Sequence, residues 1–242
     1  MCLLIVLRGS APGDDTLLVA GNRDEARDRL ASPPGLWLGE RRRVLSPRDR
    51  RAGGTWLGVN DLGMVAGLTN APGPTRPNAS SRGHLPHFAL DTEDVDAAVE
   101  AVAAATERAS YNPFQLLVAD GKTTAWVAHR VGMTTSGIVD GPVAVLTNEH
   151  TLNELHLPGL PAATADGLSL DARLEALRAV LLDRGEQSGH PVLKTGGAWG
   201  TVSSSLIAIS STAPTQLTWR YAPGPPDEVE FRNYGNLGRR LA

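Results

Sequence analysis

Cys2 is the residue best placed for covalent chemistry, and it is the only cysteine in this chain of 242 residues. A thiolate is a strong nucleophile, and the α-amine of a chain that begins with cysteine has a pKa near neutral, so it can accept the thiol proton. Methionine aminopeptidase, which removes Met1 when the second residue is small, would create this arrangement. The sequence therefore predicts an N-terminal nucleophile that forms a thioester. The alternative is a small apolar side chain in the core.

A polar cluster, Gly21–Glu25, directly follows the second apolar run. If Cys2–Leu7 and Thr16–Ala20 form a hairpin, this cluster returns beside the start of the chain. Arg23 would then lower the pKa of the thiol, and Asp24 would orient the α-amine by hydrogen bonding. The alternative is a charged hairpin end or the start of a helix.

Two asparagines each follow a predicted strand. Asn70 and Asn148 carry amide N–H groups, which can donate to the oxyanion formed when a nucleophile attacks a carbonyl. We therefore include both as candidate site residues. The alternative is that each is a turn or cap residue.

Arginines are concentrated in one part of the chain, with nine between positions 23 and 51. Such a group can bind an anionic ligand. It can also be a solvated charged face, because the chain has only two lysines and uses arginine as its ordinary cation. The candidate ligand-binding residues are Arg41, Arg42, Arg43, Arg50, Arg51 and, further along, Arg82.

Composition excludes several classes of protein. A hydrophobic fraction of 41% and a charged fraction of 20% are those of a globular protein, and we expect one domain over residues 1–242. The net charge of −3 and the absence of a recognisable binding module argue against nucleic acid. No apolar run approaches the ~20 residues that cross a bilayer, so we expect no integral membrane association. A single cysteine and no signal peptide pattern predict a cytoplasmic protein.

Metal chemistry has little support in the pattern of histidines. Among six histidines, only His84 and His87 have a spacing that suits metal ligands, and they lie in or beside a loop rich in proline and glycine. No Cys-x-x-Cys-His haem attachment motif is present. The sequence therefore predicts no metal site and no cofactor required for catalysis.

Hydrophobic periodicity predicts an α+β fold. Two helices are expected, at Thr92–Arg108 with Asp91 or Thr92 as N-cap, and at Leu170–Leu181. The segment Asn70–Gly83 is expected to be a functional surface loop, and Gly185–Gly197 a linker. The order of elements favours two antiparallel sheets between helical layers. The predicted strands are Cys2–Leu7, Thr16–Ala20, Thr55–Val59, Gly63–Thr69, Phe114–Ala119, Thr123–His129, Val143–Leu146, Ser204–Ser210 and Gln216–Tyr221.

The motifs in the first 90 residues resemble the NRDE family, also called the transport and Golgi organisation protein 2 family. The C-terminal half agrees more in strand order and in Gly200-Thr201 followed by Ser203-Ser204 than in detail. The matching motifs are Met1-Cys2, Gly21-Asn22-Arg23-Asp24-Glu25, Asp49, Gly53-Gly54-Thr55-Trp56-Leu57-Gly58, Asn60, Gly63, Leu68-Thr69-Asn70 and Ser81-Arg82-Gly83.

That family is similar to the cysteine N-terminal nucleophile (Ntn) hydrolases, which include bile-salt hydrolases, penicillin V acylases and acid ceramidase. The resemblance implies a four-layer αββα sandwich and a site made of Cys2, Arg23, Asp24, Asn70 and Asn148. The chain departs from the family pattern at Val202, where the family usually has an arginine. The positive charge that this arginine would provide is therefore either missing from the site or supplied by Arg220. The stretch after Asn148 also lacks the usual apolar-proline-tryptophan continuation.

Three functions follow from these observations. The first is a thiol hydrolase or acyltransferase that acts on a small amide or thioester. The second is a carrier of haem or of acyl-CoA or lipid, as members of the family are associated with such ligands, with Arg41–Arg51 pairing with propionates or phosphates. The third is an inactive Ntn scaffold used for protein interaction. The sequence predicts no particular oligomeric state.

Overall fold

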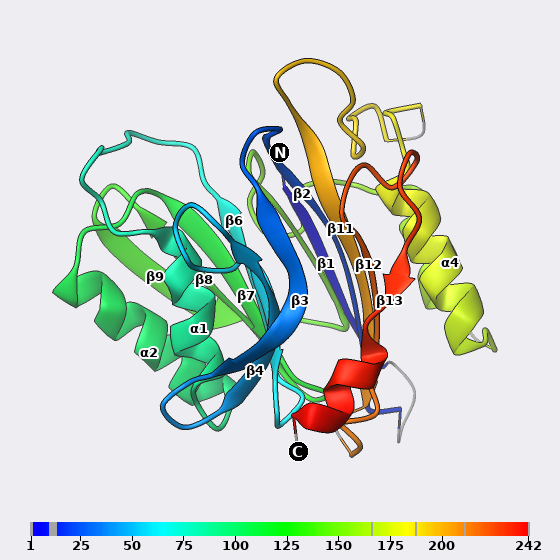
Figure 1. The fold of residues 1–242 in the computed structure, drawn as a ribbon, viewed down its shortest axis with the longest axis horizontal. Helices are drawn as coiled ribbons and strands as arrows, with labels where there is room; N and C mark the ends of the chain where they lie inside the picture. The colour runs from blue at the N-terminus through cyan, green and yellow to red at the C-terminus, as the bar shows by residue number, and fades with distance from the viewer. Residues whose placement is uncertain (1, 10–13, 166, 187, 211, 242) are drawn as a thin grey trace.

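The computed structural model, which describes residues 2–9, 14–165, 167–186, 188–210 and 212–241, has four layers (Figure 1). A pair of helices covers a seven-stranded sheet, this sheet packs on a six-stranded sheet, and further helices cover the outer face of the second sheet. All strand pairs within the two sheets are antiparallel. The predicted α+β sandwich with αββα layers is therefore confirmed.

The six-stranded sheet has the order β10-β1-β2-β11-β12-β13. Its long central strand β2 pairs with β1 on one side and with β11 on the other. Residues at the ends of β1, β2 and β10 are thus neighbours in the sheet. The strands are β1 (Leu3–Arg8), β2 (Thr16–Ala26), β10 (Val143–Thr147), β11 (Trp199–Ser210), β12 (Thr218–Ala222) and β13 (Arg232–Asn233).

The seven-stranded sheet is a meander in which strands pair in sequence order. Short turns connect its consecutive strands, except between β4 and β5 and between β6 and β7, where longer segments intervene. The strands are β3 (Ala31–Leu38), β4 (Arg43–Asp49), β5 (Leu57–Asn60), β6 (Val65–Asn70), β7 (Phe114–Ala119), β8 (Thr124–Arg130) and β9 (Met133–Ile138).

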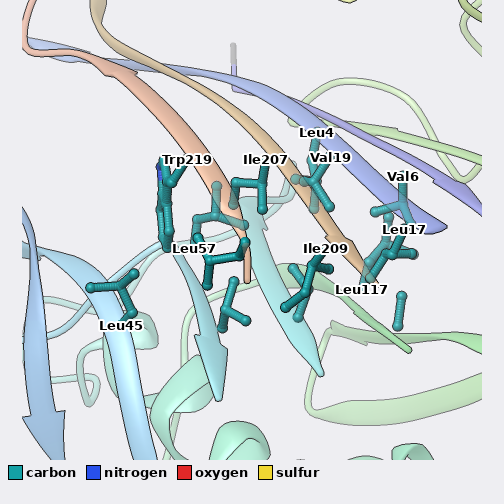
Figure 2. Packing of buried hydrophobic residues seen from close by; sticks show 14 of the residues in the cluster. Leu4, Val6, Leu17, Val19, Leu45, Leu57, Leu117, Ile207, Ile209 and Trp219 are labelled. Carbon is teal, nitrogen blue, oxygen red and sulfur yellow. The ribbon is translucent and has the colours of Figure 1, made fainter. Parts of the chain in front are cut away.

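Side chains of β1 and β2 alternate between two hydrophobic clusters, as strand geometry requires. Leu4, Val6, Leu17 and Val19 point between the sheets, where they meet side chains of the facing sheet (Figure 2). Their sequence neighbours, such as Leu18, point to the outer helices. Every side chain in the apolar part of these strands is therefore buried, which explains why both runs are continuously apolar.

Helices cover the outer faces of the sheets. α1 (Leu85–Leu90) and α2 (Val95–Arg108) pack on the seven-stranded sheet, while α3 (Leu160–Thr164) and α4 (Leu170–Leu181) pack on the other. Two short 3₁₀ helices, η1 (Arg82–His84) and η2 (Gly235–Arg240), complete the described elements. Within the described part of the chain, no helix is long and apolar enough to cross a membrane.

The N-cap of α2 differs from the prediction. Asp94 accepts a hydrogen bond from the Ala97 amide at 2.8 Å, so it is the cap rather than Asp91 or Thr92. Asp91 instead accepts from the amides of Arg41 and Arg42 at 2.9 and 2.8 Å. It therefore holds the connection between β3 and β4 against α1.

The other differences concern strands. The segment Gly21–Glu25 continues β2 to Ala26 and is not a hairpin end, because β11 pairs with β2 as far as Ala26, beyond Asn22, where the pairing with β1 ends. β3 was missed because it contains Pro33 and Pro34, which are tolerated at an irregularity of an edge strand. β4, β9 and the two-residue β13 were not predicted either. β4 has only two apolar residues before Pro47, and β9 is exposed and has no apolar alternation.

Candidate functional site

A cavity of about 390 Å³ lies at the end of the sandwich where the chain begins. Its walls come from both sheets, from the turn after β4 and from the segment between β6 and α1, and Figure 1 shows that segment at the same end as the N-terminus. The predicted functional loop does border the cavity. The residues that line it are Cys2, Arg23, Asp24, Glu25, Arg29, Asp49, Ala52, Gly54, Thr55, Trp56, Leu68, Asn70, Pro77, Ala79, Ser80, Ser81, Arg82, Gly83 and Asn112.

Cys2 lies just before β1, and alternation places it on the same face as Leu4, toward the space between the sheets. Its Sγ donates to the backbone oxygen of Asp24 at 3.7 Å. Burial, followed by the nearby Asp24 carboxylate, raises the pKa of Cys2 to about 11, although Arg23 acts in the opposite direction. The predicted lowering of the thiol pKa by Arg23 is therefore outweighed, and the thiol is protonated at neutral pH.

Asp24 is fixed by the strand next to it. Its Oδ1 accepts a hydrogen bond from the Thr201 hydroxyl at 2.7 Å, and burial raises the pKa of its carboxyl group. The register of β2 and β11 shifts between Thr201 and Ser203, so Val202 is the extra residue of a bulge. This bulge turns Thr201 toward Asp24.

Arg220 does not supply a cation at the site. In β12 it alternates with Trp219 and Tyr221, which point into the core between the sheets, so Arg220 faces the helices. There it forms an ion pair with Asp171 of α4. The expectation that Arg220 replaces an arginine at position 202 is wrong.

Asp49 connects two arginines at the cavity wall. Its Oδ2 accepts from Arg23 Nη2 at 2.8 Å and from Arg29 Nε at 2.7 Å, while its Oδ1 accepts from the amides of Arg51 and Ala52, both at 2.9 Å. Burial alone would raise the pKa of Asp49, but the Ala52 amide and the two guanidinium groups lower it overall. Arg23 is thereby held in place.

Only one of the two predicted asparagines lines the cavity. Asn70 is the last residue of β6 and lines the cavity. Asn148 follows β10, and because Leu3 pairs with Thr147, it lies next to Cys2 in register. Its Oδ1 is buried, with no hydrogen-bond partner among the described residues, and Asn148 does not line the cavity.

The arginines predicted to bind a ligand fall into three groups. Arg82 lines the cavity, and Arg50 and Arg51 lie on the turn after Asp49 without lining it. Arg41, Arg42 and Arg43 lie around the connection between β3 and β4, at the opposite end of the sandwich from the N-terminus (Figure 1). There Arg42 is 3.9 Å from Asp61, and Arg43 donates to the Leu241 carbonyl at 3.5 Å. The six arginines therefore do not form one site.

Two short glycine motifs, 53–58 and 81–83, pack against each other. A Cβ on Gly54 would lie 2.3 Å from the backbone of Gly83, so this close approach requires glycine. The Thr55 amide donates to the Gly83 carbonyl at 2.8 Å. The contact fixes one wall of the cavity and places Arg82 there.

Reasoning from the sequence assigned no role to Asp49, Arg29 or Thr201, which hold the site together. One signal was available, because a buried arginine requires an acidic partner and Asp49 lies shortly before a glycine pair, Gly53-Gly54. Nothing in the sequence pairs Thr201 with Asp24, which are separated by 177 residues. No three His, Cys, Asp or Glu side chains of the described residues are grouped as metal ligands.

Solved structures of the same shape are Ntn hydrolases. The conjugated bile acid hydrolase of Clostridium perfringens, as a mutant with alanine for its second residue, matches with a TM-score of 0.52 and 12% identity, over 97% of this chain and 92% of that one. The N-acylethanolamine-hydrolyzing acid amidase orthologue of Caenorhabditis elegans matches with a TM-score of 0.55 and 13% identity, over 88% and 94%. The fold is therefore Ntn-hydrolase-like.

Sequence comparison identifies the family. The mouse Transport and Golgi organization 2 homolog is 37% identical over 112 residues, which are 45% of this chain and 40% of that protein. The human homolog is 38% identical over 112 residues, 44% and 40% of the two chains. These matches thus span about two fifths of the relatives' own length. Because the family described as Transport and Golgi organisation 2 matches residues 1–161, this chain belongs to that family.

Proposed function

We propose that Cys2, after removal of Met1, is the nucleophile of an Ntn-type thiol hydrolase or acyltransferase that acts on a small amide or thioester. The observation that carries this proposal is the position of the Cys2 thiol, which lines a cavity beside Asp24 at the start of the chain. Two proteins of the same fold, a conjugated bile acid hydrolase and an N-acylethanolamine-hydrolyzing amidase, are named as hydrolytic enzymes.

The first step needs a base, because a thiol with a pKa of about 11 is protonated at neutral pH. The α-amine of Cys2 takes the thiol proton, and the thiolate attacks the carbonyl carbon of the substrate. Asp24 accepts a hydrogen bond from the resulting ammonium, and the Asn70 amide donates to the oxyanion. The scissile bond then breaks, the leaving amine or thiol takes the proton from the ammonium, and a thioester remains on Cys2.

The second step resolves the thioester. Water, or an acceptor amine in a transferase, loses a proton to the α-amine as it attacks the thioester carbonyl. The C–S bond breaks, and the ammonium returns its proton to the sulfur. The enzyme is thereby restored with no change in oxidation state.

Intact mass spectrometry of two forms tests this proposal. One form begins at Cys2, and the other keeps Met1 because a bulky residue is inserted after it. An activated acyl thioester should add one acyl group to the first form at least about 100-fold faster, since only that form has the base. Cys2→Ala should give no adduct. Equal acylation of the two forms, or no adduct on either, would overturn the proposal.

A haem carrier finds less support in the cavity. Haem iron takes His, Met, Tyr or thiolate ligands, and among the described residues that line the cavity only Cys2 belongs to this set. Arg41–Arg43, the arginines predicted to pair with propionates, lie at the other end of the molecule and do not line the cavity. The cavity therefore supports haem binding less well than it supports a nucleophile at Cys2.

A haem titration separates the two functions. A carrier would shift the Soret band at one equivalent, and the shift would be lost when Arg41, Arg42 and Arg43 are replaced together. An enzyme of the proposed type would show no saturable shift and would acylate at Cys2.

A further inference from the structure

Arg82 differs from the other arginines of the cavity in its partners. Its Nη1 donates to the Pro113 carbonyl at 2.8 Å, which is a neutral acceptor. Among the described residues it has no carboxylate within ion-pair distance, whereas Arg23 and Arg29 both contact Asp49. The guanidinium of Arg82 thus has donors that no charged group of the described chain occupies.

The acidic residues of the same cavity are engaged elsewhere. Asp49 is held by two guanidinium groups, and Asp24 accepts from Thr201. Glu25 lies close enough to Arg82 to interact with it, but its Oε2 is 3.2 Å from Arg29 and its Oε1 accepts from the Ala26 amide at 2.9 Å. The charge of Arg82 is therefore the least compensated in the cavity.

Arg82 is also partly buried and held in place. Burial, reinforced by the positive charge of Arg29, lowers the pKa of its guanidinium, which shows that removal from water is not offset by a strong partner. The backbone next to it is fixed by the contact of Gly83 with Gly54. A preorganised, poorly compensated cation can bind an anion at little cost in side-chain entropy.

We propose that Arg82 binds a carboxylate of the substrate, so that the site selects small amides or thioesters with a carboxylate close to the scissile carbonyl. The selectivity for a reacting substrate rests on the proposed function of Cys2. A guanidinium presents a planar set of donors that matches a carboxylate, and Arg82 and Cys2 line one cavity of about 390 Å³. A carboxylate on Arg82 therefore places the carbonyl of a short substrate at Cys2.

Two alkylating reagents of nearly equal size test the anion site independently of catalysis. Iodoacetate carries a carboxylate and iodoacetamide does not, both react with the thiolate, and Cys2 is the only thiol of the chain. We compare the second-order rate constant for iodoacetate divided by that for iodoacetamide. A change in the thiol pKa affects both rate constants equally and leaves this ratio unchanged. It should fall about tenfold or more in Arg82→Gln, which loses the charge-assisted contact.

Two matched variants control this measurement. Arg82→Lys keeps the charge but not the planar donors, so its ratio should be intermediate. Arg232→Gln removes an exposed arginine outside the cavity and should leave the ratio unchanged. An unchanged ratio in a folded Arg82→Gln protein would overturn the proposal.

A competition experiment on the wild-type chain gives a second measurement if Arg82→Gln does not fold. Succinate should protect Cys2 from iodoacetamide, whereas succinamide should not. Equal protection by the two compounds would also overturn the proposal.

Paired chromogenic amides distinguish this inference from the proposed function. One pair is the 4-nitroanilide of succinic acid and its methyl ester, and the other is the acetyl amide of 5-amino-2-nitrobenzoate and 4-nitroacetanilide. In at least one pair the carboxylate should raise kcat/KM about tenfold, and Arg82→Gln should remove the difference. Cleavage without preference for charge would overturn the inference alone. No cleavage and no acyl adduct, with the alkylation ratio as expected, would overturn the proposed function and leave the anion site.

Discussion

Both halves of β2 contain buried side chains, but these side chains are buried for different reasons. In the first half, apolar side chains such as Leu17 pack into cores on both faces of the sheet. In the second half the buried side chains are polar, and Arg23 is only 5% exposed, compared with 1% for Leu17. One strand therefore changes from core to site without a change in backbone structure.

The polar half depends on partners from distant parts of the chain. Asn22 donates to the carbonyls of Leu181 and Val192 at 2.9 and 3.2 Å, Arg23 donates to Asp49, and Asp24 accepts from Thr201. Apolar side chains are stabilised by any neighbours of suitable size and shape. A buried polar group instead requires a hydrogen-bond or ion-pair partner atom at one particular position. We therefore expect stability at this end to depend on single pairs.

The largest effect is expected for Asp49→Asn. Arg23 would remain buried beside a neutral amide, and an uncompensated buried charge costs about 3–5 kcal/mol. Urea unfolding at pH 7 measures this loss. Asp61→Asn is the control, because Asp61 is 3.9 Å from the more exposed Arg42 and should contribute about 1 kcal/mol or less. Similar losses for the two variants would mean that the polar half does not depend on this pair.

Leu17→Ala probes the apolar half. Leu17 is nearly fully buried between the sheets, so its truncation should cost about 3 kcal/mol, through lost burial and a cavity. The exposed Leu30 is the control, and Leu30→Ala should stay within about 0.5 kcal/mol of wild type. The rate of Cys2 alkylation should be unchanged in Leu17→Ala. A change in that rate would show that the two halves of β2 are not independent.

Thr201→Val should cost about 1.5–3 kcal/mol. The substitution keeps the shape of the side chain but removes the hydroxyl that donates to the Asp24 carboxylate, and hydrogen bonds to charged groups contribute about this much. Thr201→Ser keeps the donor and should recover most of the loss. Thermal unfolding of wild type, Thr201→Val and Thr201→Ser measures these losses of stability. An equal loss in the two variants would show that the hydroxyl does not account for the stabilisation.

Much of the fold could be predicted because hydrophobic periodicity is local. β7 agrees residue by residue with its predicted range, Phe114–Ala119, and α4 agrees with Leu170–Leu181, since both have uninterrupted apolar patterns. β3 and β9 could not be predicted in the same way. Their pairing depends on neighbouring strands and not on their own composition, since one contains two prolines and the other is exposed.

The candidate site could be predicted only at residues with unusual chemistry. Cys2, Arg23, Asp24, Asn70 and Arg82 were singled out by type or motif, and the structure places all of them around one cavity. The supporting contacts could not be predicted, because Asp49 and Thr201 meet their partners only through tertiary packing. The arginines at 41–43 show the converse, since a conspicuous cluster in the sequence lies far from the cavity.

The smallest expected effect is on the pH dependence of the free energy of unfolding, to which Asp49 and Asp24 contribute with opposite signs. The pKa of Asp49 is lowered in the folded chain, so its contribution is present above its unfolded pKa of ~3.9 and is lost as pH falls through the folded pKa. The pKa of Asp24 is raised, so its protonation favours the folded chain as pH falls from that raised pKa to the unfolded pKa of ~3.9, which is above the range in which the contribution of Asp49 is lost. Wild type should therefore lose stability more steeply below pH ~4 than Asp49→Asn, which keeps Asp24. Urea unfolding between pH 6 and 2.5 measures both slopes, and parallel curves would show that the Asp49 carboxylate is not the group that titrates.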